Sequence, residues 1–414
     1  MSAATSEPTR AAGLRRLQDF APSAGADYAK ARNFDFGAKR RGNVSTLSPY
    51  LRHRLVLEPE VLETTLRLHA PADAGKFVEE VFWRGYFKGW LEQRPDVWAD
   101  YSDDLNTLVQ QLDDDAGLAE RYIKAVDGST GMDCFDEWAS ELVSTGYLHN
   151  HARMWFASIW IYTLGLPWQL GADFFYRHLA DGDPASNTLS WRWVCGLHTP
   201  GKTYLARAAN IAKFTENRFN PDGQLATSAP PVADTRTYPV RPLPDLQTLP
   251  PKLRFGLLIT EEDGCPGLPL GGQRPVAILG ALATRMRSPL KTGDRAVEFA
   301  AGAVADALAR ATLGLEADGE ISESRDWPDA IVDWASRHRL RAVVTAYAPV
   351  GPVAELLAKV GRELACHDIR LIELRREYDS TTWPHAQRGY FKLKKQIPAI
   401  LERLAIPAAH DGAL

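Results

Sequence analysis

The pattern of apolar residues changes once along this chain of 414 residues, and that change limits the fold more than any other feature. From Tyr28 to about residue 220, apolar residues recur at helical spacing, as in FVEEVFWRGYFKGWLEQ at 77–93 and HARMWFASIWIYTLG at 151–165. No convincing run of alternating strand residues interrupts this stretch. The sequence therefore predicts an all-α domain over residues 21–220, preceded by a flexible N-terminus at residues 1–20.

Residues 221–251 are rich in Pro, Ser, Thr and Ala and predict a linker that crosses the surface. Beyond it, short apolar runs at 253–260, 275–282, 341–347 and 369–374 alternate with amphipathic stretches at 296–311, 329–339 and 353–365. Strands that alternate with helices are typical of βαβ units. Residues 252–414 are thus predicted to form an α/β Rossmann-like domain with a parallel sheet and a C-terminal tail.

Composition narrows the functional classes. The net charge of −4 argues against bulk attraction to nucleic acid but leaves room for a local basic groove. The four cysteines form no CxxC pair, which disfavours a zinc ribbon, and no metal is predicted; an iron–sulfur cluster on widely spaced cysteines stays open. The N-terminus lacks an apolar secretory signal, and no apolar run would span a bilayer. A cytoplasmic monomer is expected.

The segment NVSTLSPYLRHRL at 43–55 predicts an anion site. Ser48 is a good N-cap and Pro49 suits the first helical position. A helix start with free N–H groups and the nearby hydroxyls of Ser45 and Thr46 would bind phosphate. From these residues alone, a plain capped helix without a ligand is the favoured interpretation.

Three segments, YLHNHARM at 147–154, ADGDPASNTLSWRW at 180–193 and the phosphate loop at 43–55, together resemble the flavin-binding part of the DNA photolyase and cryptochrome family. The resemblance implies a photolyase-type FAD-binding domain, FAD as the cofactor and ultraviolet-damaged DNA as the partner. The family places its α/β domain first, whereas this chain carries its α/β pattern last, so the two domains are exchanged in sequence.

The resemblance also implies roles for single residues around FAD. Near the phosphates it places Tyr28, Ser45, Thr46, Leu47 and Ser48. Asn150, Arg153 and Met154 share one helix face by their spacing of i, i+3 and i+4, and Arg153 should pair with Asp181 beside the flavin ring. Asp183 would hold the ribose or adenine side. Asn187 falls opposite flavin N5, where an amide favours repair over signalling.

On the substrate side, Glu80, Trp83, Arg84 and Phe87 fall on one helical face. By resemblance, Glu80 would hydrogen-bond an extruded pyrimidine, Trp83 would stack on it, and Trp193 would form the opposite wall. Arg84 and Arg52 are predicted to contact DNA. Asn150 with Met154 resembles the type that repairs cyclobutane dimers, since relatives acting on (6-4) photoproducts carry histidine at the position of Asn150.

For electron transfer, Trp191 falls at the flavin-proximal position of the family's tryptophan chain and Trp168 at the middle one. The outer position has no matching tryptophan, and Trp98, Tyr122 or Trp160 would have to replace it. The predicted function is light-driven, FAD-dependent repair of cyclobutane pyrimidine dimers. A cryptochrome-like blue-light photoreceptor is the first alternative, and a DNA- or flavin-binding module without chemistry is another. An antenna chromophore in the α/β domain stays unknown.

One motif competes with this interpretation. GLHTPGKT, at Gly196 to Thr203, satisfies the P-loop pattern GxxxxGK[ST] and would indicate a nucleotide hydrolase. WRWVC before it would have to be a strand, and the following YLARAANIAKF a helix. The surrounding helical pattern offers no sheet to anchor such a loop.

Overall fold

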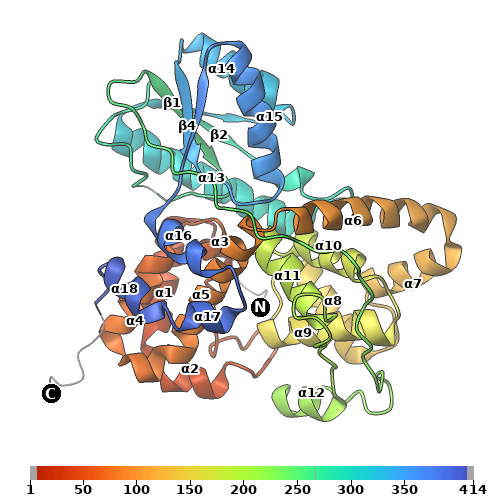
Figure 1. Cartoon of the computed structure of the whole chain (residues 1–414). Helices are drawn as coiled ribbons and strands as arrows, with labels where there is room; N and C mark the ends of the chain where they lie inside the picture. The colour runs from red at the N-terminus through yellow and green to blue at the C-terminus, as the bar shows by residue number, and fades with distance from the viewer. Residues whose placement is uncertain (1–6, 266, 408–414) are drawn as a thin grey trace.

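The computed structural model of the chain describes residues 7–265 and 267–407, and it divides into a helical part and an α/β part (Figure 1). This division confirms the predicted fold class. The helical part contains α1 (Arg10–Phe20), α2 (Ala26–Ala31), α3 (Ser48–Arg52), α4 (Glu58–Leu68), α5 (Pro71–Glu92), α6 (Asp96–Asp114), α7 (Ala116–Val126), α8 (Asp133–Thr145), α9 (Asn150–Ser158), α10 (Trp168–His178), α11 (Pro184–Val194) and α12 (Ala208–Phe214). One π-turn, Ile159–Thr163, extends α9. Among the described residues, no helix combines the length and the apolar character that a membrane crossing requires.

The N-terminal segment is more ordered than its polar composition predicts. Residues 10–20, expected to be flexible, form α1, whose start is capped by the Thr9 hydroxyl at 3.2 Å from the Ala12 amide. Leu17 and Phe20 bury their side chains in the core shared by α1, α4 and α5. Only three of these eleven residues are buried, so the apolar stripe is too sparse to be read as a helix from sequence. Residues 1–6 lie outside the described residues.

The α/β part holds β1 (Phe255–Thr260), β2 (Ala277–Ala281), β3 (Asp318–Ser322), β4 (Ala342–Ala346) and β5 (Arg370–Leu374) in one sheet of order β3-β2-β1-β4-β5. All four pairings are parallel, as predicted. One face packs on α13 (Asp294–Leu315) and the other on α14 (Trp327–Arg337) and α15 (Pro352–Cys366). β3 is an exposed edge strand of sequence DGEIS. Because its residues are mostly polar, the apolar pattern of the sequence did not predict it.

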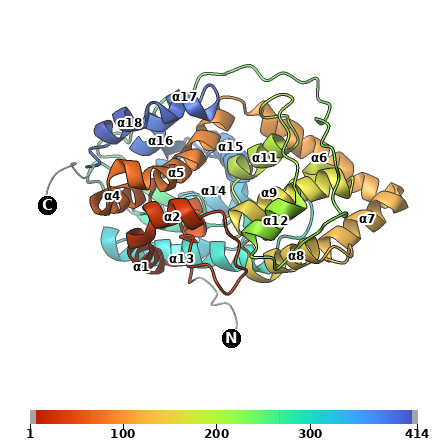
Figure 2. The same ribbon diagram turned by 90° about the horizontal axis from the view of Figure 1, so that it is seen from below.

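Between α12 and β1 the chain runs extended over the helical part (Figure 2). Arg236 fastens it to α6 through Asp104 at 2.8 Å and Asp100 at 3.7 Å, and Arg241 pairs with Asp96 on the same helix. The three acids are spaced four residues apart and so line one face of α6. The segment predicted as a linker is therefore held in place by a row of ion pairs.

The C-terminal segment leaves the sheet and packs on the helical part. It comprises α16 (Glu377–Thr382), a short 3₁₀ turn (Trp383–His385), α17 (Tyr390–Lys394) and α18 (Ile397–Arg403), which lie beside α5 and α4 (Figure 2). Tyr378, Tyr390, Leu393 and Ile400 belong to the same apolar core as Phe82 of α5. The tail counted with the α/β domain from sequence is thus, in packing terms, part of the helical one.

Candidate functional site

The acid pair that the sequence singles out lies where α11 begins. Asp183 caps this helix, and its Oδ1 accepts the Ser186 amide at 2.7 Å, with Pro184 at the first helical position. Its Oδ2 lies 3.5 Å from Nζ of Lys88 and 4.0 Å from Nη1 of Arg84, both on α5. Burial alone would raise the pKa of Asp183, but these cations outweigh it and hold the pKa well below its ordinary value.

The predicted pairing of Arg153 with Asp181 is confirmed. Nη2 of Arg153 donates to both carboxylate oxygens, at 3.0 and 3.1 Å, and its Nε donates to the Leu148 carbonyl at 2.9 Å. Burial opposes ionisation of Asp181, yet Arg153, Arg84 and a hydrogen bond from Ser48 lower its pKa overall. Asp181 therefore stays ionised and brings the phosphate-loop serine, α9 and α11 to one place.

Tyr147 is a member of this cluster that the sequence did not reveal. The guanidinium groups of Arg41 and Arg153 lie over its ring, 4.3 and 5.5 Å from the centroid. Burial raises the pKa of its phenol, so the ring stays neutral. Arg41 also pairs with Glu141 of α8. The only sequence signal for Tyr147 is its place directly before LHNHARM.

The loop before α3 is strained, as functional loops often are. Thr46 adopts a φ of 49°, the left-handed region that β-branched residues avoid. Ser45 Oγ accepts the Leu47 amide at 3.3 Å. The helix begins at Ser48, with buried Leu47 at the N-cap position and no capping side chain, so the prediction that Ser48 caps it is wrong by one residue. Ser48 turns its hydroxyl to Asp181 instead.

Tyr28 and Glu80 meet through one arginine. Arg32, the residue directly after α2, forms an ion pair with Glu80 of α5 and a hydrogen bond with Tyr28. Burial raises the pKa of Tyr28 and keeps its phenol neutral. The residue expected near the cofactor phosphates and the residue expected on the substrate therefore lie in one network, although 52 residues separate them in sequence.

The polar residues of α9 and α11 differ in burial. Asn187 is buried, and its Nδ2 donates to the Ala172 carbonyl at 2.8 Å, which leaves Oδ1 as an acceptor. Asn150 is the exposed first residue of α9, and Met154 is half-buried one turn later. His149, at the N-cap, accepts the His151 amide through Nδ1 at 3.2 Å.

The tryptophans fall into two groups. Trp191 is buried in a T-shaped contact with Trp160, with ring centroids 6.3 Å apart, and a Cβ on Gly171 would lie 2.4 Å from its ring. Trp168 is buried and stacks on Tyr101, 5.6 Å away. Trp83 and Trp193 are nearer the surface: Trp83 stacks on Tyr390, and Trp193 on Tyr204.

Of the two arginines predicted to contact DNA, Arg52 is placed away from the surface, and Arg84 is partly exposed. Arg52 is buried: it donates to both carboxylate oxygens of Glu262, at 2.6 and 2.7 Å, and to the Gly182 carbonyl at 2.7 Å. Arg84 turns inward to Asp183, and its Nη1 is buried. The buried Arg52 guanidinium is therefore not available to a DNA backbone, whereas a DNA contact of the partly exposed Arg84 stays a prediction. The charge of an arginine is visible in sequence, but its buried partner 210 residues away is not.

The P-loop alternative lacks its structural context. The residues before Gly196 belong to helix α11, and the next element is helix α12. Among the described residues, every strand lies after residue 254, so no strand leads into GLHTPGKT. A phosphate-binding P-loop needs a strand before it and a helix after it. The loop instead places His198 against the aromatic side chains of α5, with its Nε2 3.2 Å from the Tyr86 hydroxyl.

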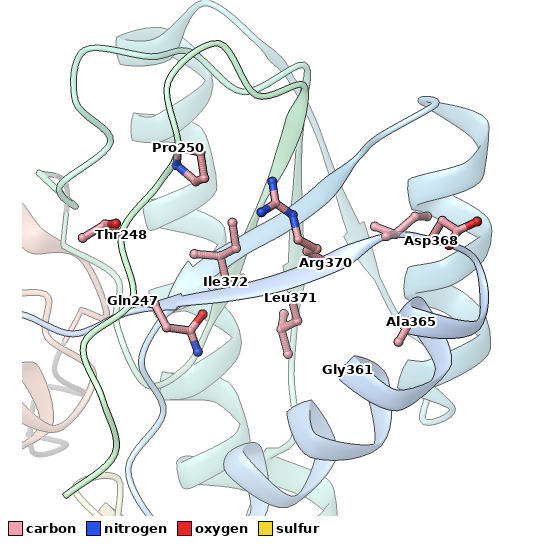
Figure 3. Close-up of a pocket in the computed structure, with 10 residues that line it drawn as sticks. Gln247, Thr248, Pro250, Gly361, Ala365, Asp368, Arg370, Leu371 and Ile372 are labelled. Atoms are coloured by element: carbon pink, nitrogen blue, oxygen red, sulfur yellow. The ribbon is translucent and has the colours of Figure 1, made fainter.

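A pocket of about 700 Å³ lies elsewhere, where the linker passes the free edge of β5 (Figure 3). Gln247, Thr248 and Pro250 face Arg370 and Ile372 across it. No predicted site residue lines it. Nor does the carboxyl end of β1, the usual ligand position in such sheets, present a neutral crevice: Glu261, Glu262 and Asp263 follow β1 and are all buried.

The cluster around Asp181 and Asp183 fits a dinucleotide. In the part of the chain that the structure describes, Nη1 of Arg84, Nζ of Lys88 and Nε2 of His149 are buried without a hydrogen-bond partner. Buried donors of this kind call for oxygen acceptors, which the diphosphate, ribityl and ring carbonyls of FAD supply. Lys88 was missed from sequence, although it lies one turn beyond Arg84 on the same helix.

Comparison with known proteins gives one consistent result. Residues 77–231 match the family described as the FAD binding domain of DNA photolyase. A deoxyribodipyrimidine photo-lyase of Synechococcus sp. is 29% identical over 255 residues, which cover 59% of this chain and 47% of the relative. One from Streptomyces griseus is 33% identical over 156 residues, covering 37% of this chain and 32% of the relative.

Among solved structures, a bacterial class III photolyase from Agrobacterium tumefaciens is 26% identical with a TM-score of 0.43, covering 50% of this chain and 43% of that one. The chain thus spans about a third to a half of the length of these relatives. The matched residues 77–231 span the acid pair, Arg153 and the part of α5 that carries Glu80 and Trp83.

Proposed function

Because the helical part of this chain belongs to the DNA photolyase and cryptochrome family, we propose that the protein is a deoxyribodipyrimidine photolyase, a carbon–carbon lyase that repairs cyclobutane pyrimidine dimers in DNA. One observation carries the proposal. Helix α5 presents Arg84 and Lys88 to the buried acid pair, and the half-buried Glu80 and Trp83 precede them on the same helix. A single rigid element therefore links a cofactor side to a substrate side.

Bound FAD in its reduced form would supply the light-driven electron transfer that breaks the two carbon–carbon bonds joining the pyrimidines, and return of the electron would leave no net redox change. The protein does not need an acid–base pair for this chemistry. Its own part is binding, orientation and electrostatic tuning.

The phosphate side would be held by Tyr28 and the loop of Ser45, Thr46, Leu47 and Ser48. The loop approaches Asp181 through Ser48 and is held in a strained conformation at Thr46. A fixed loop loses little entropy when it binds a ligand, because its backbone is already ordered.

Next to the ring system, Arg153 would place a positive charge that favours an anionic cofactor. Asp181 holds the guanidinium in position through two hydrogen bonds. Asn187 would present Oδ1 to flavin N5, since its Nδ2 is held by the Ala172 carbonyl. Asn150 and Met154 extend the same lining from α9, and Asp183 would hold the ribose or adenine side with Lys88 behind it.

On the substrate side, Trp83 would stack on an extruded pyrimidine and Glu80 would accept a hydrogen bond from it. Extrusion costs a few kcal/mol, and stacking on an aromatic side chain recovers roughly 1–3 kcal/mol per base. Glu80 pairs with Arg32 through Oε1, and its other carboxylate oxygen would accept this hydrogen bond. Trp193, with 36% of its surface exposed, would form the facing wall.

The experiment uses the purified chain and a dimer-containing oligonucleotide. We expect the absorption spectrum of an oxidised flavin, and loss of the dimers under blue light after the flavin is reduced. Flavin without repair in the reduced, illuminated sample would support the alternative of a cryptochrome-like photoreceptor. A colourless protein that takes up no FAD would rule out both. Repair of (6-4) photoproducts instead of dimers would contradict the assignment of Asn150.

A further inference from the structure

The C-terminal segment is built into α5 and does not simply rest on it. A Cβ on Gly89 would lie 2.8 Å from the Cα of Trp383, and one on Gly85 would lie 3.0 Å from the hydroxyl of Tyr378. These two glycines, one turn apart, let the segment approach the helix backbone. Nε2 of Gln93 then donates to the Trp383 carbonyl at 3.0 Å. The turn after α16 is therefore fixed against the helix that carries the proposed substrate residues.

This attachment places Tyr390 flat against Trp83. The two ring centroids are 3.6 Å apart and the planes differ by 11°. The Tyr390 hydroxyl donates to the Glu79 carbonyl at 2.9 Å, and its ring also meets Tyr86 edge-on at 5.6 Å. Tyr390 is only 3% exposed, so its ring is fixed in this position.

The contacts of Tyr390 decide which side of Trp83 it covers. Residues 79, 83 and 86 form one row along α5, at spacings of i, i+4 and i+7. Residues 80, 83 and 87 form the neighbouring row, at i, i+3 and i+7. Tyr390 touches the first row, so it covers the Trp83 ring on the side of Glu79 and Tyr86. A substrate would approach Trp83 from the side of Glu80 and Phe87. The rings of Tyr390 and Trp83 make a two-ring platform.

The neighbouring residue, Phe391, points the other way. It is 74% exposed, whereas Tyr390 and Leu393 on the same short helix are buried. Arg388, Lys392 and Lys395 around it are exposed as well. Lys394 is tied to Glu79 at 2.8 Å and so anchors the segment. Phe391 and these three exposed cations together form a surface that combines an apolar ring with positive charge.

That partner is a nucleic-acid strand. Its phosphates match the cations, and a base step opened by extrusion offers an apolar face for an aromatic side chain to stack on. An acidic peptide would satisfy the cations, but it would not explain why the aromatic surface continues through Tyr390 to Trp83. Because the whole chain carries a net charge of −4, attraction to phosphates has to come from a local basic patch such as this one.

We propose that residues 383–395 form part of the lesion-binding site: Tyr390 braces Trp83, and Phe391 with Arg388, Lys392 and Lys395 binds the strand next to the extruded base. This inference rests on the proposed function for its substrate, but its test is a dark binding measurement that needs no light-driven repair. Phe391 is a positioning residue, since it would fill the gap in the stack and not touch the reacting bonds.

The test compares Phe391→Ala with Leu313→Ala, which removes another exposed apolar side chain, on α13. Each FAD-loaded protein is titrated in the dark, by fluorescence anisotropy, with a labelled duplex that carries a two-base mismatch and with its fully paired counterpart. We expect Phe391→Ala to weaken binding of the mismatched duplex about tenfold and of the paired duplex much less. Equal affinities for Phe391→Ala and Leu313→Ala would overturn the proposal.

Salt dependence tests the cations separately. For the double variant Lys392→Ala and Lys395→Ala, the slope of log affinity against log salt should fall by about 2, since each phosphate contact contributes about 0.9. Lys359→Ala, an exposed lysine on α15, should leave it unchanged. An unchanged slope in the double variant would also overturn the proposal.

The two proposals fail in different ways. If the wild-type protein repairs no dimers but the Phe391→Ala variant binds the mismatched duplex more weakly than the wild type does, the repair function is wrong and the binding surface stands. If the wild-type protein repairs dimers and Phe391→Ala binds and repairs as well as Leu313→Ala, the surface is wrong and the repair function stands.

Discussion

Arg52 and Glu262 join the two parts of the chain through a buried, two-pronged ion pair, with Nη1–Oε2 and Nη2–Oε1 distances of 2.7 and 2.6 Å. Replacing Arg52 with Ala would leave Glu262 buried without its partner, which costs roughly 3–5 kcal/mol in unfolding free energy. Urea denaturation would measure the loss. Arg40→Ala is the control, because Arg40 pairs with Glu216 at the surface and should change stability by less than about 1 kcal/mol. A stability of Arg52→Ala equal to that of Arg40→Ala would contradict the interdomain role.

Glu92 should make stability depend on pH. Burial raises its pKa to about 7, although its carboxylate accepts the Tyr347 hydroxyl at 2.6 Å and the Val350 amide at 2.5 Å. Since the folded pKa lies above the unfolded one, the folded protein holds a proton that the unfolded chain releases. The contribution to stability is therefore complete below about pH 4 and is lost as the pH rises to about 7, by roughly 3 kcal/mol.

The variant Glu92→Gln removes this titration and keeps the shape of the side chain. The difference in unfolding free energy between Glu92→Gln and the wild type, followed from pH 4.5 to pH 8 in about half-unit steps, should grow in favour of the variant up to about pH 7. Parallel pH profiles for the two proteins would show that Glu92 does not titrate in this range.

Two glycines of α5 should respond to alanine in opposite ways. Gly89→Ala would force a methyl group against Trp383, and we expect a loss of about 1–3 kcal/mol, as for other overpacked sites. Gly75→Ala on the same helix meets nothing within 4 Å and should gain roughly 0.5–1 kcal/mol, because alanine loses less backbone entropy in a helix. Thermal unfolding of both variants would test the pair, and a stabilised Gly89→Ala protein would mean that the C-terminal segment packs elsewhere.

The electron path is expected to begin at Trp191. In the proposed function, Trp191→Phe should lose most of the photoreduction of bound FAD, yet still repair dimers once the flavin is reduced chemically. Trp160→Phe and Trp168→Phe then distinguish the next step, because Trp160 contacts Trp191 directly while Trp168 stacks on Tyr101. Flavin absorbance during blue illumination is the measurement. Normal photoreduction in Trp191→Phe would remove this tryptophan from the path.

Elements with a strong apolar rhythm were predictable, and elements defined by distant partners were not. The runs at 253–260 and 341–347 became β1 and β4 because both faces of those strands are buried. β3 and α17 were not predicted. β3 is a polar strand at the sheet edge, and α17 is a single turn whose burial depends on α5. Residues 10–20 were not predicted to be helical for a similar reason, because α1 buries Leu17 and Phe20 against helices that follow it in sequence.

Within the site, the motif gave the pairing of Arg153 with Asp181, because both residues lie in segments of fixed local structure. It did not give the burial of Arg52, which depends on a carboxylate in the other part of the chain, nor the stacking of Tyr390 on Trp83 across 307 positions. Lys88 was missed because a lysine is almost never fully buried, and Tyr147 because it lies between two helices, where the sequence has no periodic pattern.

Both ends of the described chain cross the boundary between its two parts. Arg10 at the start of α1 donates its amide to Asp306 of α13 at 3.1 Å, and residues 378–400 fill the interior beside α5. Severing the polypeptide at the linker would therefore not release two self-sufficient halves. A fragment limited to the helical part would need residues 377–406 joined to it by circular permutation, because truncation at the linker removes the side chains that cover α5.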